Sequence, residues 1–495
     1  MRKRFEQQLE FGSQLITEVE IDKRSRDQLS QLLSGLQYIF TKEELNEQVF
    51  QILEAKVLAG KKVTGRSGMT LWEILVLGSI RQNLDIDYDR LHHISNFDMS
   101  VRGIMGVHNL TSDWEKKKYY PLQTIKDNVV LLDEETMSKI SAVVVEAGHK
   151  LKKNENPTGK NTEIGLELKT DSYAVETTIH FPTDIWILWD SIRKCLDVIT
   201  LLKKEVEVED WRKMHVWISK SKKGYNRVAN IHRKKGRNYK ERLERATRDY
   251  LAISSEVSKR VVITMMKLES VGSKKALILL IELKRYHDYL LKLSDQVERR
   301  ILKGEKIPHN EKIFSIFEDH TEWLAKGKIG RPVELGHNVQ ITTDQYHFIV
   351  DHKVMVKEVD KETTIALGKR LEANFSDGYK LLSISFDRGF YSKLGYEFLE
   401  EIFDLVVMPK PGKKSGSQEL LESGDDFVEK RKKHSAVEAN INELEHCGAN
   451  KVPDKGLNGF KRYVGWSVLS YNLKRLGKIV MEQELLSTVQ YLNAA

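Results

Sequence analysis

Cysteine and long apolar runs are scarce in this chain of 495 residues. Its two cysteines, Cys195 and Cys447, are far apart and show no CxxC or Cys/His spacing, which excludes a disulfide framework and argues against a zinc site. The longest apolar run, 276–281, is too short to span a bilayer, and residues 1–6 lack the apolar core of a secretory signal. These absences predict a cytoplasmic protein without a membrane partner.

The chain has neither an internal repeat nor a low-complexity tail. Its length exceeds that of one ordinary domain, so two or three domains are expected. Hydrophobic residues make up 40%, as in a soluble globular protein. The 80 Lys and Arg against 72 Asp and Glu give a formal charge of +8, an excess that matters for binding only where it is clustered.

Residues 1–155 are predicted to be mainly helical. Thr70 and Glu73 form a capping-box pattern that begins a helix reaching Asn83, and a second short helix is expected over 87–94. Two helices with a tight connection are compatible with a DNA-reading helix-turn-helix, although such pairs are more often packing units. This region is therefore assigned to recognition of DNA ends or to dimer contacts.

A polar linker over 152–161 precedes an alternating strand that leads to Asp171. Helical periodicity then runs from about Ile185 to Lys326, and strand signals resume at 333–336, 339–342 and 347–351, the last two as a hairpin. The pattern predicts a catalytic domain split by an insertion. The expected boundaries are 160–200 plus 331–480 for the split domain, 200–330 for the insertion and 481–495 for a C-terminal tail.

Basic side chains gather within the insertion, where only Glu241 and Glu244 oppose them and Tyr225, His232 and Tyr239 are interleaved. The cluster consists of Lys220, Lys222, Lys223, Arg227, Arg233, Lys234, Lys235, Arg237, Lys240, Arg242, Arg245 and Arg248. A charge run is usually a solvated helix face, but this density with so little compensation favours contact with a polyanion. Lys222, Lys223, Arg233, Lys234, Lys235 and Arg237 are the candidate DNA contacts.

Three acidic residues, two at predicted strand ends and one on a predicted helix, indicate a metal site. Asp171 ends one alternating strand, Asp387 follows the apolar strand 381–386, and Glu438 is expected on a later helix with His434 four residues before it and Asn442 four after. Carboxylates on rigid elements suit magnesium, and two such ions can activate water and stabilise the leaving oxygen of a phosphodiester. Taken singly, however, each acid could be a turn former, a helix cap or a surface acid.

The local sequence around these acids resembles that of bacterial insertion-sequence transposases of the DDE type. The resemblance rests on 170–184 with its Pro-Thr-Asp, on the Asp-Arg-Gly-aromatic segment 386–392, on 434–442, and on a closing helix over 467–477. These motifs occur in the family's order and cover roughly residues 70–480, with the insertion matched only in character. Each motif alone is weak, but the conjunction is specific.

The resemblance implies an α/β fold with an RNase H-like mixed sheet flanked by helices, interrupted by a helical insertion and preceded by an all-α region. It implies that Asp171, Asp387 and Glu438 bind two ions of Mg2+ or Mn2+. The implied activity is cleavage of the ends of a DNA element and joining of the 3′-hydroxyl to target DNA. The implied partner is double-stranded DNA, bound by a homodimer, with the protein associated with the bacterial nucleoid when bound.

The chain departs from the family on the third helix. Some relatives carry an Arg four residues before the glutamate and a Lys seven after it, where this chain has His434 and Glu445. Arg431, Lys432 or Lys433 could replace the missing phosphate contact. Glu443 and Glu445 compete with Glu438 as the third acid, and Glu438 is preferred because of its Ser-Ala-Val-Glu context.

Several nearby groups have a structural and a functional interpretation. Arg388 is either a surface charge or a contact to the DNA backbone beside the scissile bond. The segment 182–184 is expected to cap the following helix, and His180 and His434 are expected to be structural or to face DNA, because hard ions prefer oxygen ligands. Lys410, Lys413 and Lys414 form a basic loop expected near DNA.

Three functions remain open from the sequence. The first is transposition by strand cleavage and transfer. The second is DNA binding by a protein that keeps the fold without the chemistry, and the third is a metal-dependent nuclease without strand transfer. The presence of all three acids favours an enzyme.

Overall fold

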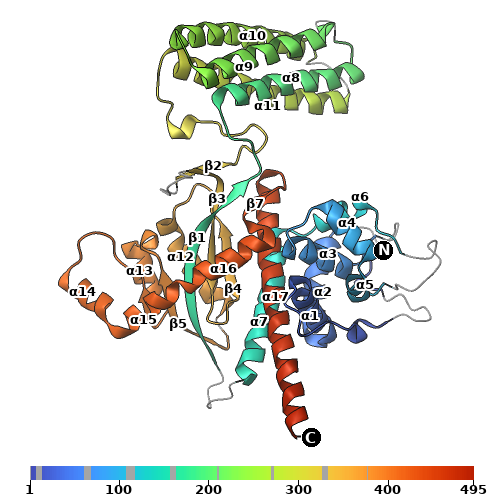
Figure 1. Cartoon of the computed structure of the whole chain (residues 1–495), viewed down its shortest axis with the longest axis vertical. Coiled ribbons are helices and arrows are strands. Elements are labelled where there is room, and N and C mark those ends of the chain that lie inside the picture. Colours follow the sequence, from blue (N-terminus) through green and yellow to red (C-terminus); the bar gives the residue numbers. More distant parts are fainter. Residues whose placement is uncertain are drawn as a thin grey trace. The chain divides into compact units, whose positions relative to one another are not determined.

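The computed structural model describes residues 2–6, 14–60, 68–107, 118–155, 163–208, 211–268, 273–325, 333–375 and 377–494. The chain divides into two compact units (Figure 1). The sheet unit comprises Met1–Thr178 and Leu324–Ala495, and the helical unit comprises Ile179–Trp323. Within the described residues, every helix is too short or too polar to cross a lipid bilayer.

Short helices open the sheet unit and pack around one long helix, α17 (Gly456–Ala494). They are η1 (Ile16–Glu18), α1 (Gln28–Thr41), α2 (Glu43–Val57), α3 (Leu71–Asn83), α4 (Tyr88–Phe97), α5 (Met99–Ile104), α6 (Leu122–Val129) and α7 (Glu134–Glu155). The capping box is confirmed: Glu73 Oε2 accepts from the Thr70 amide at 2.8 Å, and Thr70 Oγ1 accepts from the Glu73 amide at 3.2 Å. Every residue of α3 is buried, so α3 is a core helix and only α4 of this pair has an exposed face.

A mixed sheet forms the centre of the sheet unit. Its strands are β1 (Ile164–Thr177), β2 (Glu322–Ala325), β3 (Val333–Thr343), β4 (Ile349–Val354), β5 (Tyr379–Phe386), β6 (Leu405–Val407) and β7 (Lys451–Val452). The order is β2-β3-β1-β5-β6, with β4 also on β3 and β7 also on β1. Strand β3 pairs antiparallel with both β1 and β4, whereas β1, β5 and β6 are parallel. Residues 333–336 and 339–342 were expected to form two short strands, but both belong to the single strand β3. The strand is continuous because the alternation of apolar and polar residues continues through the polar residues between the two segments.

Alternation along β1 gives the sheet two covered faces. Tyr173 and Val175 pack under α16 (Ala436–Leu444) and α17, and Leu166 and Leu168 pack under α12 (Asp360–Asn374) and α13 (Lys393–Glu400) (Figure 1). The remaining elements of this half are η5 (Arg388–Phe390), α14 (Gly416–Ser423), α15 (Asp425–His434) and η6 (Glu445–Ala449). Sheet and helices thus build a layered α/β structure.

The helical unit is a bundle of four long helices with its own core. These are α8 (Asp184–Glu205), α9 (Met214–Lys234), α10 (Tyr239–Lys267) and α11 (Lys274–Val297), followed by η3 (Glu298–Leu302) and η4 (His309–Glu311). Large side chains such as Trp211 and Tyr250 are fully buried between the helices.

The observed boundaries correct the expected ones in two places. The helical unit begins at Ile179 rather than near residue 200, because the apolar face of α8 packs into the bundle core. Residues 481–495 are not a separate tail, since α17 continues to Ala494.

Candidate active site

Parallel pairing of β1 with β5 brings Asp171 and Asp387 to neighbouring positions. The register pairs Thr170 with Phe386, so the next residue on each strand is one of the two aspartates. Asp387 comes directly after β5, as the sequence predicts, but Asp171 lies inside β1, which continues six residues further to pair with β3 and β7. Asp171 is therefore at the end of the β1–β5 pairing and not at the end of its strand.

The surroundings of the two aspartates act on their charge in opposite directions. Burial, with a smaller contribution from the negative charge of Asp387, raises the pKa of Asp171 to about 6 against the opposing hydrogen bond from the Ser172 amide. The pKa of Asp387 is lowered, chiefly by its interaction with His434. At neutral pH both carboxylates are ionised. The charged form of Asp171 is less favourable than that of a free aspartate because its side chain is largely buried.

His434 connects β5 to the helices that cover it. Its Nδ1 lies 3.0 Å from Ser385 Oγ, and its Nε2 lies 3.5 Å from Asp387 Oδ1. The imidazole is largely buried, which places it against the sheet rather than toward a DNA surface. Arg431 and Arg388 are both exposed, and their charges also lower the pKa of Asp387. These two cations are therefore the ones suited to meet a phosphate beside Asp387.

A further carboxylate, Asp360, lies next to this pair. It is the first residue of α12, and its Oδ1 accepts from Ser172 Oγ at 2.7 Å. A Cβ built on Gly389 would stand 3.3 Å from its Oδ2, and its charge adds to the raised pKa of Asp171. Asp360 was not predicted as a site residue, because an acid in the first turn of a helix is an ordinary helix-start residue. Only the fold shows that this helix begins beside Asp171.

Glu438 is exposed on α16, and no hydrogen bond or ion pair that involves its carboxylate is found within the described residues. The four-residue spacing predicts that His434 and Glu438 share one face of an unbroken helix. That prediction is wrong: α15 ends at His434, α16 starts at Ala436, and His434 is buried where Glu438 is exposed. Asn442 is exposed like Glu438.

The two competing acids have other neighbours. Glu443 forms an ion pair with Lys474 at 3.0 Å, and the charge of Glu445 contributes to the raised pKa of buried Tyr173. Both acids are therefore engaged elsewhere in this arrangement. Glu438 and Glu443 are both exposed on α16, but only Glu443 has an ion-pair partner among the described residues.

The donor chemistry of the aspartates fits a hard divalent cation. Among the described residues, the one hydrogen bond to the Asp171 carboxylate comes from the Ser172 amide, which leaves other lone pairs for a ligand. A cation would also relieve the repulsion between Asp171 and Asp387. However, no group of three or more His, Cys, Asp or Glu side chains in the described part of the chain is arranged to hold a metal ion.

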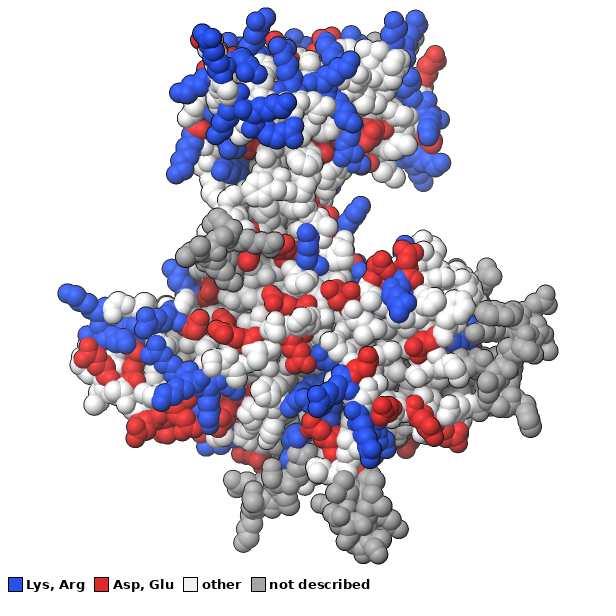
Figure 2. Space-filling model, viewed as in Figure 1, with Lys and Arg blue, Asp and Glu red and all other residues white. Residues whose placement is uncertain are grey.

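The basic cluster of the sequence lies on α9, on α10 and on the turn between them. Lys222, Lys223, Arg233, Lys234, Lys235 and Arg237 are all exposed. Ion pairs do occur within the wider cluster, since Arg227 contacts Asp249 at 3.0 Å and Arg248 contacts Glu244 at 3.1 Å. No such pair involves the six candidates among the described residues. Figure 2 shows Lys and Arg crowded over the helical unit.

The turn between α9 and α10 presents several of these cations. Lys235, Gly236 and Asn238 all have positive φ, at 49°, 97° and 52°. A non-glycine residue rarely adopts this backbone region, and such strain is concentrated at functional sites. The turn thereby projects Lys234, Lys235 and Arg237 from the end of the helix pair.

Other predicted residues have structural partners. Thr183 is the N-cap of α8, but its side chain makes no capping hydrogen bond, so the expected cap is incomplete. His180 Nε2 lies 2.7 Å from Asp190 Oδ2, as a structural histidine would. In the basic loop, Lys414 pairs with Glu422 at 2.6 Å, and Lys410 donates its backbone amide to the same carboxylate.

Comparison of the chain with protein-family models, with curated proteins and with solved structures found no match.

Proposed function

We propose that this chain is a DDE transposase of an insertion sequence, which binds the ends of a DNA element and catalyses metal-dependent strand cleavage and 3′-hydroxyl transfer. The observation that carries the proposal is the pairing of β1 with β5, which brings two aspartates 216 positions apart in sequence to adjacent sites (387 − 171). The raised pKa of Asp171 supports it, since perturbed ionisation is concentrated at functional sites.

We further propose that the sheet is RNase H-like. The support is its mixed character: three antiparallel strands lie on one side, and two parallel strands extend from β1 on the other. The helical unit then occupies the connection between β1 and β3, as an insertion into this sheet.

The residues around the aspartates have separate tasks in this proposal. Asp171 and Asp387 would hold Mg2+ or Mn2+, which when bound supplies activation of water and stabilisation of the leaving oxygen. His434 lowers the pKa of Asp387, and Ser385 Oγ, 3.0 Å from its Nδ1, would help to orient the His434 ring. Arg388 and Arg431 would bind the phosphate backbone, and Glu438 would join as the third acid.

The helical unit would hold double-stranded DNA through its unpaired cations. Phosphate contacts of this kind give affinity without sequence information, and they release counterions. A homodimer on DNA would supply two active sites for two element ends. This part of the proposal is supported by the exposure of Lys222, Lys223, Arg233, Lys234, Lys235 and Arg237.

One observation favours a second candidate, a DNA-binding protein without the chemistry. No group of three His, Cys, Asp or Glu side chains among the described residues is arranged to hold a metal ion, so Asp171, Asp387 and Glu438 do not form a ready three-acid site. A nuclease without strand transfer would use the same acids.

Cleavage of plasmid DNA tests the proposal. Supercoiled plasmid carrying the DNA that flanks the coding sequence is incubated with the natural chain or with Asp387→Asn, in Mg2+, Mn2+ or chelator. We expect end-specific, metal-dependent cutting that the variant loses by at least 100-fold, because the amide cannot replace a charged ligand. Binding without cutting in every metal would favour the second candidate, and cutting without joined products would favour the nuclease.

A further inference from the structure

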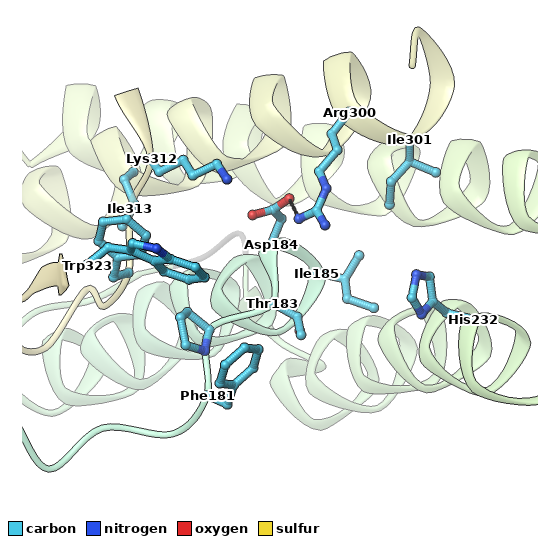
Figure 3. A pocket seen from close by; sticks show the side chains of 12 residues that line it. Phe181, Thr183, Asp184, Ile185, His232, Arg300, Ile301, Lys312, Ile313 and Trp323 are labelled. Carbon is cyan, nitrogen blue, oxygen red and sulfur yellow. Dashed lines mark hydrogen bonds and ion pairs between the residues drawn. The ribbon is translucent and has the colours of Figure 1, made fainter. Parts of the chain in front are cut away.

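A cavity of about 240 Å3 lies within the helical unit, where the start of α8 meets η3 and the segment before β2. Figure 3 shows Trp323 and Phe181 toward one end of it and His232 at the other, with Lys312 and Arg300 reaching in between. The volume is below the roughly 300–1,000 Å3 of pockets for drug-sized ligands. It therefore suits one planar group of a larger molecule.

The aromatic side chains leave ring surface available at this cavity. Phe181 is 65% exposed, so most of the surface of its ring is accessible to a ligand. Trp323 is partly exposed, and Lys312 Nζ lies 5.9 Å from the centre of one of its rings. Such a pair of rings can take a flat aromatic ligand by stacking.

The charges at the cavity favour an anion beside the stacked ring. Arg300 is held by Asp184, with Nη1 and Oδ2 2.5 Å apart, so these two charges compensate. Lys312 forms no ion pair with a carboxylate among the described residues, which leaves one positive charge directed into the cavity. Aromatic rings with an uncompensated cation are the recognition chemistry of a nucleotide.

We propose that this cavity binds one unpaired nucleotide of a DNA strand, with the base against Phe181 and Trp323 and its phosphate at Lys312. The inference rests on the proposed DNA function and adds a site for single-stranded DNA to it. Duplex DNA, whose bases are stacked on each other, contacts the basic helices without entering the cavity.

Binding of labelled oligonucleotides to the full chain tests this. Fluorescence anisotropy measures the affinity for a fluorescein-labelled 12-nucleotide single strand and for its duplex, without divalent metal, for the natural chain, Phe181→Ala, Trp323→Ala and Lys312→Ala. We expect each aromatic variant to lose fivefold or more in single-strand affinity and to keep its duplex affinity within twofold. Lys312→Arg should restore most of what Lys312→Ala loses.

Phe317→Ala is the matched control. Phe317 is 36% exposed in the same unit and has Arg193 and Lys194 near its ring, but it does not line the cavity. Because Phe181 is already exposed, its truncation leaves the core intact, and the far-ultraviolet circular dichroism spectrum checks the fold. Unchanged single-strand affinity in Phe181→Ala and Trp323→Ala would overturn the cavity proposal while leaving duplex binding and cleavage standing. Equal losses in the control and in the cavity variants would overturn it as well.

Discussion

Asp171 and Asp387 occupy neighbouring positions, yet their surroundings shift the two pKa values in opposite directions. Asp171 is largely buried and next to a like charge, whereas Asp387 is exposed and close to His434, Arg431 and Arg388. A group whose charge is unfavourable in the folded state lowers stability wherever it is ionised. The negative charges of Asp171 and Asp387 therefore repel each other, and a bound cation would reduce this repulsion.

Asp171→Asn is expected to stabilise the free protein above pH 6. The folded state holds this carboxyl at a pKa of about 6, above its ordinary value of 3.8, so between pH 4 and 6 the unfolded chain ionises first and the folded state loses stability. Removing the charge should raise the free energy of unfolding by about 1–2 kcal/mol at pH 7.5, after allowance for partial exposure. Urea titrations at pH 7.5 and pH 4.5 measure this, and the gain should be clearly smaller at the lower pH, because it disappears only below the ordinary pKa of 3.8.

Asp387→Asn serves as the control of opposite sign. Its pKa is lowered in the folded state, so its ionised form stabilises that state above the ordinary pKa, and this contribution is lost as pH falls through the folded pKa. The variant should therefore be less stable than the natural chain at pH 7.5. If both variants shifted stability in the same direction at pH 7.5, the assignment of the two environments would be wrong.

Residue types and local sequence patterns were enough to predict Asp171 and Asp387 as site residues, because the alternation within a strand and the end of a strand are visible in a short stretch of sequence. Asp360 was missed for a physical reason: its role depends on where α12 begins in space, and the β4–α12 connection has no pattern that records this. Sequence alone likewise placed His434 and Glu438 on one face, since it assumed an unbroken helix.

At the scale of elements, the break at Ser435 decides where the third acid stands. Buried His434 ends α15 against the sheet, and α16 then turns its apolar side, with Val437 and Leu444, into the core. Glu438 follows Val437 directly and so faces solvent. Because the described residues hold no ready three-acid metal group, we expect DNA or metal to favour a state in which Glu438 joins the aspartates.

Glu438→Gln should separate metal binding from cleavage. Because no three-acid group among the described residues is arranged to hold a metal, the variant should bind Mn2+ within about twofold of the natural chain, as measured by calorimetry on the free protein. Asp387→Asn, in the same titration, should weaken binding about tenfold or more, since it removes a charged ligand. Cleavage should be lost in both variants. A Glu438→Gln chain that binds Mn2+ as poorly as Asp387→Asn would show that three acids are already assembled without DNA.

Close packing of α1 against α17 depends on two glycines. A Cβ at Gly477 would collide with the backbone carbonyl of Gln31, and a Cβ at Gly35 with that of Leu473. Gly477→Ala is therefore expected to separate the helices and to cost about 1–3 kcal/mol of unfolding free energy. Gly416→Ala, at an open position that begins α14, is the matched control and should be neutral or slightly stabilising. Urea unfolding of both variants checks this; equal stabilities would refute the tight contact.

At the scale of the whole molecule, the sequence predicted an interrupted α/β domain and the position of the interruption, because helical periodicity between two sets of strands is visible without coordinates. It misplaced the boundary at α8, since an amphipathic helix does not show which core it faces. The N-terminal helices were expected as a region of their own, but they share one core with α17.

The helical unit should fold when residues 179–323 are expressed alone. It has a separate core around Trp211 and Tyr250, and its ends are close because Phe181 and Trp323 line one cavity. Cooperative urea unfolding, followed by tryptophan fluorescence, would establish this. A gradual transition without a folded baseline would mean that the unit depends on the rest of the chain.

The affinity of the isolated helical unit for duplex DNA should depend on its exposed lysine and arginine side chains. Replacing Lys222, Lys223, Lys234 and Lys235 with Gln removes four charges that no carboxylate compensates within the described residues. Each lost phosphate contact should reduce the slope of log affinity against log salt by about 1, so the slope should fall by up to about 4. Anisotropy titrations of a 20-base-pair duplex at several salt concentrations measure it. Arg227→Gln is the control, since Asp249 already pairs with this arginine; a larger loss in the control than in the fourfold variant would place the DNA on another face of the bundle.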